Sequence, residues 1–357
     1  MITIRMTGFQ LFQPDPTTTF VQLSATSATY QASARWQRAI TCRISNSVGG
    51  VPPDHRCDVV VIGAGAAGVS AAIECYDIQL DVVVLETAAE VGGQIDQIPH
   101  TVRNVAVANE GNEAVVDALA RHAATLGDRL RLGEAVTRLD PADGFVEAGP
   151  HRYRARSLLV ATGSRRRELE QAPDGSFGGN VTYLVEPHLA KFAGLPMAVF
   201  GGGDSAVLDA LALAAEGSAV TLVHRSPHLT ARQDLVERVR SQSLITEMAG
   251  WDLDTLIGSD DLQGVEVLNG RTSERRRLDV KGVVLKLGRE PCVDLVRGHL
   301  DLGAHGGIAV DADLRTSDPR TFAAGDVVEG AYARIATAIG QGSLAARSIL
   351  GSLEPRP

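Results

Sequence analysis

Two short glycine clusters, each directly after an apolar run, constrain the fold of this 357-residue chain more than any other feature. The first run, residues 57–62, is unbroken and rich in β-branched side chains, which is typical of a strand buried on both faces of a parallel sheet. The cluster 63–68 (GAGAAG) follows at once, and an Ala-rich segment over 69–75 is predicted to be a helix. A second predicted strand over 82–85 ends in Glu86. The pattern predicts a strand–GxGxxG–helix–strand–acid unit.

Each part of this unit has a mechanical role in binding a dinucleotide. Gly63 allows a tight turn, Gly65 lets the backbone approach a pyrophosphate, and Gly68 lets the helix pack closely on the strand. The N–H groups at the start of the helix attract the anion, and Glu86 is expected to accept hydrogen bonds from ribose hydroxyls. A glycine-rich turn between packed elements is the alternative, but it does not account for the surrounding strands and acid. We therefore predict a dinucleotide site here.

The same unit occurs again, 138 residues further along the chain. Residues 197–200 form its predicted first strand, 207–215 its helix and 220–223 its second strand, and the cluster between them reads GxGxxA. Where the first unit carries its acid, the second carries His224 followed by Arg225. The candidate nicotinamide nucleotide contacts are Gly201, Gly203, Asp204, Ser205, Ala206, His224 and Arg225.

The charge at the end of the second strand distinguishes the two predicted sites. A carboxylate repels a ribose 2′-phosphate, whereas an arginine attracts it. We interpret the first site as one for FAD and the second as one for NAD(P) that favours NADP, with an exposed strand end as the plainer explanation of His224 and Arg225. A chain with both sites is expected to move hydride from NAD(P)H to flavin. The flavin itself is then the catalytic group, and the protein supplies its placement.

Composition excludes several other classes of protein. The net charge of −9 argues against a general nucleic-acid binder, which needs a basic face. The chain lacks an apolar run of about 18 residues, so we expect no membrane-spanning helix and a cytoplasmic protein. The four cysteines, Cys42, Cys57, Cys75 and Cys292, are too few for a disulfide scaffold. They also form no C-x-x-C or metal-ligand pair, so no metal site is expected.

Residues 1–55 differ in composition from the remainder of the chain. They contain no Glu or Lys, carry 13 Ser and Thr, and show no helical or strand periodicity. Such a segment buries little apolar surface, so we expect a disordered or loosely attached tail, with the fold beginning near Arg56. The acid-poor, Arg- and Ser-rich bias resembles a transit peptide, but we favour an upstream extension without a targeting role.

Further motifs resemble those of the low-molecular-weight thioredoxin reductase group of flavoproteins. Beyond the two glycine clusters these are Gly92-Gly93-Gln94, Asn104, Ala161-Thr162-Gly163, residues 322–326 (FAAGD) and residues 332–337 (YARIAT). The resemblance extends over about residues 57–355. It implies an α/β fold of two Rossmann-like domains, with the FAD-binding domain in two pieces, 56–165 and 283–357. The NAD(P)-binding domain, 166–282, is inserted between them, and the chain is expected to form a homodimer.

The resemblance also implies the flavin contacts. Gly93 and Gln94 would lie near the flavin, Asp326 would hold a ribityl hydroxyl, and residues 334–337 would open a helix facing the N1/O2 edge of the flavin. A helix N-terminus there favours the negative charge of reduced flavin. The implied FAD contacts are Gly63, Gly65, Gly68, Glu86, Gly93, Gln94, Asn104, Val136, Thr162, Gly163, Gly325, Asp326, Ile335 and Thr337.

The chain departs from this group in its cysteines. Thioredoxin reductases carry a redox Cys pair just before the second glycine cluster, yet residues 164–200 contain no cysteine. The large disulfide reductases carry theirs soon after the first acid, and residues 87–104 contain none either. Because thiol–disulfide exchange requires a dithiol, we expect the reduced flavin to deliver its electrons directly.

One branch of the group lacks the Cys pair, the thioredoxin reductase-like ferredoxin–NADP reductases. Residues 183–194 and the second glycine cluster resemble that branch. After His224 the branch usually shows further arginines, where this chain has Ser226 and Thr230, with Arg232 close by. The chain also ends at Pro357 without the aromatic-bearing extension of that branch.

Three functions are compatible with these observations. The leading hypothesis is an NAD(P)H oxidoreductase that passes electrons to ferredoxin, flavodoxin, a quinone or another small molecule. The alternative is a flavin-dependent oxidase or dehydrogenase of a small substrate in specialised metabolism, and the third is a flavin-bound sensor. Two basic runs, Arg165–Arg167 and Arg275–Arg277, suit docking of an acidic carrier, but we favour solvated loops for both.

Overall fold

The computed structural model describes residues 54–95, 98, 102, 105 and 112–353. The expectations for residues 1–53 and for Asn104 lie outside this part of the chain. The helices are α1 (Ala66–Asp77), α2 (Asn112–Ala123), α3 (Ser176–Gly179), α4 (Leu189–Phe192), α5 (Asp204–Ala215), α6 (Gln233–Ser241) and α7 (Ile335–Leu353), with short 3₁₀ helices η2 (Ala124–Arg129) and η3 (Glu186–His188). Within the described residues, every helix is too short or too polar to cross a lipid bilayer.

The first sheet is built around strand β1, whose sequence predicted a fully buried strand. It consists of β1 (His55–Ile62), β2 (Val82–Glu86), β3 (Leu130–Leu132), β4 (Val136–Asp140), β5 (Phe145–Ala148), β6 (His151–Val160) and β17 (Thr321–Ala323). The strand order is β3-β2-β1-β6-β5-β4, and β17 pairs with β6. Strands β3, β2, β1, β6 and β17 run parallel, whereas β5 pairs antiparallel with β6 and β4 pairs antiparallel with β5.

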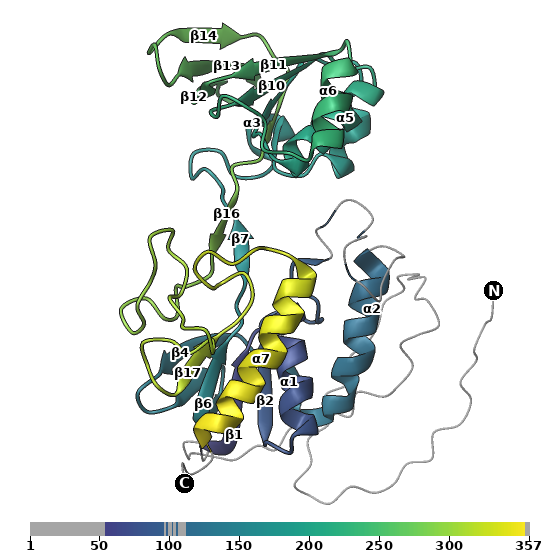
Figure 1. Ribbon diagram of the computed structural model, residues 1–357. Helices are drawn as coiled ribbons and strands as arrows, with labels where there is room; N and C mark the ends of the chain where they lie inside the picture. The colour runs from purple at the N-terminus through teal and green to yellow at the C-terminus, as the bar shows by residue number, and fades with distance from the viewer. Residues whose placement is uncertain (1–53, 96–97, 99–101, 103–104, 106–111, 354–357) are drawn as a thin grey trace, which may run out of the picture. The chain divides into compact units, whose positions relative to one another are not determined.

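Apolar side chains fill both faces of this sheet. Val59 and Val61 of β1 join one core cluster, while Val60 and Ile62 join the other, as the alternation of a strand requires. Helices α1 and α7 pack against each other on the first face (Figure 1). Their close approach needs Gly342, because a Cβ there would lie 2.2 Å from the carbonyl oxygen of Ala67.

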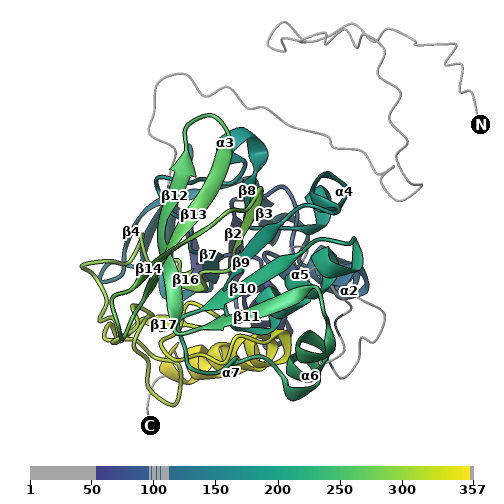
Figure 2. The same cartoon turned by 90° about the horizontal axis from the view of Figure 1, so that it is seen from above.

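The second sheet is entirely parallel. It consists of β8 (Val181–Thr182), β9 (Met197–Phe200), β10 (Val220–His224), β11 (Ile245–Ala249) and β15 (Gly282–Leu285), in the order β11-β10-β9-β15-β8. Figure 2 shows β9, β10 and β11 side by side. Helices α5 and α6 supply Val207, Leu213 and Leu235 to the core on one face.

An antiparallel sheet of β12 (Trp251–Gly258), β13 (Leu262–Asn269) and β14 (Arg275–Leu278) covers the opposite face of the second sheet. Trp251, Val265 and Val267 pack there with Phe200. The remaining strands, β7 (Ser164–Arg166) and β16 (Arg289–Pro291), pair with each other where the chain leaves the first sheet and returns to it (Figure 1). Residues 289–291 therefore form one strand of a two-stranded ribbon.

The repeat seen in the sequence is present in the structure at the level of single residues. Helix α5 begins and ends 138 residues after α1, and β10 does the same relative to β2. This confirms the prediction of two Rossmann-like units. Both helices begin three residues earlier than predicted. Each begins directly after its cap, Gly65 or Gly203, so the last three residues of each glycine cluster already form the first helical turn. The predicted domain boundaries stay predictions.

Candidate functional site

The first glycine loop joins β1 to α1 at the carboxyl edge of the first sheet. Gly63 has a φ of +106°, and a Cβ there would lie 2.4 Å from the carbonyl oxygen of Ala161. A Cβ on Gly68 would lie 1.9 Å from the carbonyl oxygen of Gly63. In contrast, a Cβ on Gly65 would point into open space. Two of the glycines are therefore required by packing, and the middle one leaves room for a ligand to approach the backbone.

The start of α1 is suited to an anion. Gly65 caps the helix, and no side chain in the described part of the chain caps its first N–H groups. Unpaired N–H groups at a helix start attract negative charge. Together with the open space at Gly65, this fits the pyrophosphate of FAD.

Backbone amides hold both carboxylate oxygens of Glu86 at the end of β2. Oε2 accepts from the N–H of Ala64 at 2.6 Å, and Oε1 accepts from the N–H of Ala88 at 2.8 Å. Each carboxylate oxygen can accept more than one hydrogen bond. The amides therefore orient Glu86 beside the glycine loop and leave acceptor capacity for ribose hydroxyls.

Two of the flavin contacts implied by the resemblance, Gln94 and Asp326, bond to one hydroxyl, that of Ser164. Gln94 donates from Nε2 to Ser164 Oγ at 3.2 Å, and Ser164 Oγ donates to Asp326 Oδ2 at 3.3 Å. A Cβ on Gly163 would lie 3.1 Å from Gln94 Nε2. Gly93 lies against the first loop, where its Cβ would be 3.3 Å from the Cα of Gly65. Gln94 and Asp326, which are more than 200 residues apart in sequence, are thus joined through Ser164 beside the first loop.

Sequence reasoning missed two residues of this network, Ser164 and Arg289. Arg289 donates from Nε to Ser164 Oγ at 3.1 Å and from Nη2 to the Ser164 carbonyl at 2.9 Å. Burial lowers the pKa of Arg289, and the nearby Asp326 opposes that shift. For Ser164 the available signal was its position directly after the motif Thr162-Gly163, whereas no motif described above adjoins Arg289.

Two hydrogen bonds join the crossover at Thr162 and Gly163 to Cys292, which directly follows β16. Thr162 donates from Oγ1 to the carbonyl of Cys292 at 2.7 Å, and Cys292 N–H donates to the carbonyl of Gly163 at 3.0 Å. The candidate flavin contacts Thr162 and Gly163 therefore have a fixed backbone.

The C-terminal motif lies against the first loop. Gly325 has a φ of +81° and donates its N–H to Gln341 Oε1 at 2.8 Å, and its Cβ would lie 3.0 Å from that of Ala67. Helix α7 begins at Ile335, with Thr337 in its first turn, so the predicted helix start is confirmed. Val136 is the first residue of β4. The fold thus brings the turn before Asp326 next to the helix that follows the first glycine loop.

The second glycine loop has the same design. Gly201 has a φ of +139°, and its Cβ would lie 2.8 Å from the carbonyl oxygen of Lys286. Asp204, in the first turn of α5, accepts from the N–H of Arg232 at 2.8 Å and forms an ion pair with its guanidinium. Thr230 N–H donates to the carbonyl of Gly202 at 2.8 Å, so the segment after β10 folds over the loop.

His224 lies inside the protein. Its side chain is 2% exposed, Nδ1 is 2.8 Å from the carbonyl oxygen of Ser226, and Nε2 is 3.2 Å from Oε1 of Glu247. Both ring nitrogens are therefore engaged by acceptors of the chain. Of the two residues proposed to read a 2′-phosphate, Arg225 is the exposed one.

Both basic runs are paired with nearby carboxylates. Arg165 contacts Glu290 and Asp294, and Arg166 contacts Glu168 and Asp174. The second run is paired as follows: Arg275 with Asp254, Arg276 with Glu274 and Arg277 with Asp279. The prediction of loops is wrong, because the runs begin in strands β7 and β14, but the pairing fits a locally neutralised surface.

The cysteines of the described chain are free thiols. Cys57 on β1 and Cys75 on α1 belong to core clusters on opposite faces of the first sheet. Burial raises the pKa of each to about 12. Cys292 is half-buried, and burial raises its pKa as well. Cys42 lies outside the described residues.

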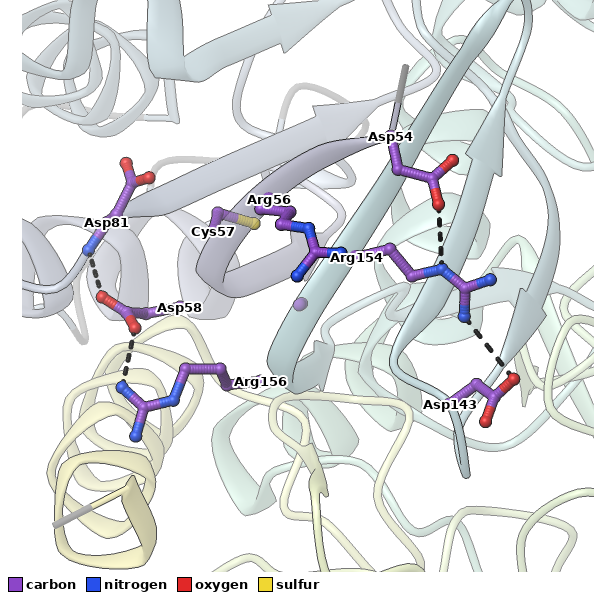
Figure 3. A pocket seen from close by; sticks show the side chains of 9 residues that line it. Asp54, Arg56, Cys57, Asp58, Asp81, Asp143, Arg154 and Arg156 are labelled. Carbon is purple, nitrogen blue, oxygen red and sulfur yellow. Dashed lines mark hydrogen bonds and ion pairs between the residues drawn. The ribbon is translucent and has the colours of Figure 1, made fainter. Parts of the chain in front are cut away.

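A separate cavity lies at the other edge of the first sheet, where β1 begins (Figure 3). Asp54, Arg56, Asp58, Arg154 and Arg156 are among its lining residues, and Figure 3 shows Arg154 bonded to Asp54 and Arg156 bonded to Asp58. None of the predicted site residues lines it. Parallel sheets bind ligands at the carboxyl ends of their strands, so we assign the functional site to the glycine loops instead. No three His, Cys, Asp or Glu side chains of the described residues gather as ligands for a metal ion.

Comparison with known proteins agrees with this geometry. Residues 57–342 match the family described as pyridine nucleotide-disulphide oxidoreductase. The "34.2 kDa protein in rubredoxin operon" of Clostridium pasteurianum is 30% identical over 302 residues, which cover 82% of this chain and 96% of that protein. The thioredoxin reductase of Mycolicibacterium smegmatis is 30% identical over 293 residues, which cover 81% and 94%.

Two solved structures of similar sequence share the fold. The thioredoxin reductase of Lactococcus lactis superposes with a TM-score of 0.73 at 27% identity and covers 83% of this chain and 98% of its own. The thioredoxin reductase of T. acidophilum gives a TM-score of 0.72 at 27% identity and covers 84% and 99%. The chain therefore belongs to the pyridine nucleotide-disulphide oxidoreductase family, and it is a thioredoxin reductase-like flavoprotein oxidoreductase whose cofactors are FAD and NADPH.

Proposed function

We propose that this protein oxidises NADPH and passes the electrons directly from its flavin to an external acceptor, without a redox disulfide. The cysteine arrangement carries this proposal. Segments 87–104 and 164–200, where relatives carry their Cys pair, contain no cysteine. Cys57 and Cys75 lie on opposite faces of a sheet, and Cys292 is a single thiol.

The chemistry of these thiols supports the same conclusion. The thiolate is the reactive form in disulfide exchange, and a buried thiol with a pKa of about 12 stays protonated at neutral pH. Reduction of a disulfide also needs a second thiol to release the mixed disulfide. Neither requirement is met by Cys57 or Cys75, so electrons are expected to leave from the flavin itself.

The residues at the two glycine loops fit the roles that this reaction needs. Glu86 would hold the ribose of FAD, and the first turn of α1 would face the pyrophosphate. Asp326, whose carboxylate accepts a hydrogen bond from Ser164, would hold a ribityl hydroxyl. The start of α7 would face the pyrimidine edge of the flavin and favour negative charge there. The bound FAD supplies the hydride acceptor and the electron carrier of the reaction. Around Gly201, Gly203 and Asp204, the second loop would hold NADPH.

The acceptor is the least constrained part of the proposal. The pairing of both arginine runs with local carboxylates weakens the case for either run as a docking surface for ferredoxin or flavodoxin. This favours a small-molecule acceptor. A protein carrier is still included in the test, because one relative is described by its place in a rubredoxin operon.

The proposal is tested by mixing the purified FAD-loaded protein anaerobically with NADPH, then with NADH, at the flavin absorbance band. We expect rapid bleaching with NADPH. Reoxidation is then followed with ferredoxin, flavodoxin, a soluble quinone, dioxygen and thioredoxin. Reoxidation by thioredoxin alone would overturn the proposal. Failure of both nucleotides to bleach the flavin would favour an oxidase or dehydrogenase of another substrate, for which the second glycine loop has no evident use. The homodimer and the cytoplasmic location stay predictions.

A further inference from the structure

A buried ion pair lies directly beneath the second glycine loop. Lys286, the residue after β15, places its Nζ 2.8 Å from Oδ2 of Asp209 on α5 and donates to the carbonyl of Tyr183 at 2.7 Å. The side chain of Asp209 is 1% exposed and that of Lys286 is 14% exposed. Neither carboxylate oxygen of Asp209 has a hydrogen-bond partner of good geometry among the described residues, so the ion pair with Lys286 is what compensates its charge.

Lys286 contacts the chain on both sides of the loop. Its N–H donates to the carbonyl of Phe200, the last residue of β9, at 2.8 Å. Its Cβ lies 2.9 Å from the position that a Cβ on Gly201 would take. Its ammonium reaches Asp209, which lies on the helix that follows the loop. One residue thus connects the strand before the loop, the loop and the helix after it, the strand through its backbone N–H and the helix through its ammonium.

The position of Lys286 relates it to one half of the nucleotide. Dinucleotides bind across the point where the strand order of a parallel sheet reverses. Here β10 and β15 flank β9 on opposite sides. The adenosine half belongs to the β10 side, where Arg225 follows the strand. The nicotinamide half therefore extends over the carboxyl ends of β15 and β8, where Lys286 and Tyr183 lie.

The ion pair of Asp209 and Lys286 is not explained by a contribution to the stability of the fold. Burial raises the pKa of Asp209 to about 6, with Lys286 opposing the shift and Glu186 adding to it. A buried ion pair contributes little net stability compared with packed apolar side chains. An ammonium carries three N–H donors. The Tyr183 carbonyl accepts one of them and Asp209 pairs with the charge, so the ammonium keeps donor capacity for a group at the mouth of the site.

We propose that Lys286, held in place by Asp209, is a positioning residue for the nicotinamide half of NADPH. This rests on the proposed use of the second glycine loop. The backbone of Lys286 sets the entry to the loop. The residue directly follows β15, at the edge of the sheet where the nicotinamide ribose and carboxamide would lie, and its ammonium would donate to them there. Loss of the ammonium should therefore weaken binding of the nicotinamide half of NADPH and leave binding of the adenosine half unaffected.

The test compares two ligands on the FAD-loaded protein by isothermal titration calorimetry. Lys286→Met should raise the Kd for NADP⁺ by about tenfold, the loss expected of a hydrogen bond from a charged group, and should leave the Kd for 2′,5′-ADP within about twofold of wild type. Lys281→Met is the control, because Lys281 is exposed and lies at the opposite end of the same strand. It should change neither constant.

Other outcomes contradict the inference in distinct ways. If both ligands weaken equally, the pair supports the loop as a whole and does not act on the nicotinamide half. If neither weakens, the pair is only structural. Lys286→Met could fail to fold because it leaves the charge of Asp209 uncompensated. In that case the double variant Asp209→Leu with Lys286→Met, which removes both charges, is used. A rise in its Kd for NADP⁺ without a rise in its Kd for 2′,5′-ADP would support the inference, and an equal change in both would contradict it. NADP⁺ binding that depends on Lys286 in a protein reoxidised only by thioredoxin would overturn the proposed electron route but not this inference.

Discussion

Glu86 accepts a hydrogen bond from the backbone N–H of Ala64, with Oε2 2.6 Å from the nitrogen. Ala64 lies inside the first glycine loop, and Glu86 ends the neighbouring strand. The carboxylate that is proposed to bind the ribose of FAD therefore also holds the loop that is proposed to bind its pyrophosphate. Loop shape and ribose recognition are linked through one side chain.

This link predicts a loss of flavin on substitution of Glu86. Glu86→Ala removes the acceptor for Ala64 and for the ribose, and we expect the Kd for FAD to rise by about tenfold or more. The measurement is the FAD retained per protein after gel filtration, followed by titration of the stripped protein. Glu90→Ala, an exposed carboxylate four residues on, is the control. Equal flavin retention in both variants would remove Glu86 from the site.

The two glycines of the first loop should respond differently to alanine. A Cβ on Gly68 meets the Gly63 carbonyl, so Gly68→Ala should lower the free energy of unfolding by about 1–3 kcal/mol. A Cβ on Gly65 meets open space at an allowed φ of −73°, so Gly65→Ala should change that free energy by about 0.5 kcal/mol or less. Gly65→Ala should nevertheless weaken FAD binding. Denaturation and FAD titration of both apoproteins check this contrast, and tight FAD binding by Gly65→Ala would contradict the placement of the pyrophosphate.

The hydroxyl of Ser164 is expected to matter for both stability and flavin environment. Ser164→Ala removes the group that joins Gln94, Asp326 and Arg289, and a lost buried hydrogen-bond partner costs about 1–3 kcal/mol. We expect a lower unfolding free energy and a shifted flavin absorbance band. Ser241→Ala is the matched control, since Ser241 is exposed and bonds only locally to Arg238. An unchanged flavin spectrum in Ser164→Ala would place the flavin away from this network.

Direct electron transfer predicts that no single thiol is needed for turnover. Cys292→Ser should retain the NADPH-dependent reduction of the acceptor within about twofold, because Cys292 lacks a partner thiol among the described residues. The measurement is steady-state NADPH oxidation with the best acceptor of the panel. If Cys292→Ser lost acceptor reduction while NADPH still bleached its flavin normally, the thiol would carry the electrons onward.

The hydrogen bonds that Glu329 accepts from His305 and Gly307 predict a pH-dependent contribution to stability. Hydrogen bonds from the His305 backbone and ring and from Gly307 N–H lower the pKa of Glu329 below its usual value of 4.5. A carboxyl with a lowered pKa stabilises the fold at neutral pH, and this is lost as the pH falls through the lowered value. The Tm of wild type should therefore exceed that of Glu329→Gln at neutral pH, and the difference should close as the pH falls below 4.5 and through the lowered pKa. A constant gap from pH 7 to pH 3 would show that the carboxylate charge is irrelevant.

The sequence by itself determined the two strand–glycine–helix–strand units. Their signals are local: a β-branched run, a glycine where a Cβ would clash, and an acid or a cation at a strand end. The 138-residue repeat therefore appears at the same helix and strand ends in the structure. The helix starts were predicted three residues late, because each helix was expected to follow the whole glycine cluster, whereas the last three residues of each cluster already form the first turn.

Only the tertiary structure decided which side chains meet. Ser164 and Arg289 are 125 residues apart, and Asp209 and Lys286 are 77 apart, yet each pair is in contact. His224 was read as a cation for a phosphate, and the fold instead engages its ring with Ser226 and Glu247. Local sequence encodes backbone conformation because neighbours along the chain set it. Contacts across strands depend on how whole elements pack, and no short segment carries that information.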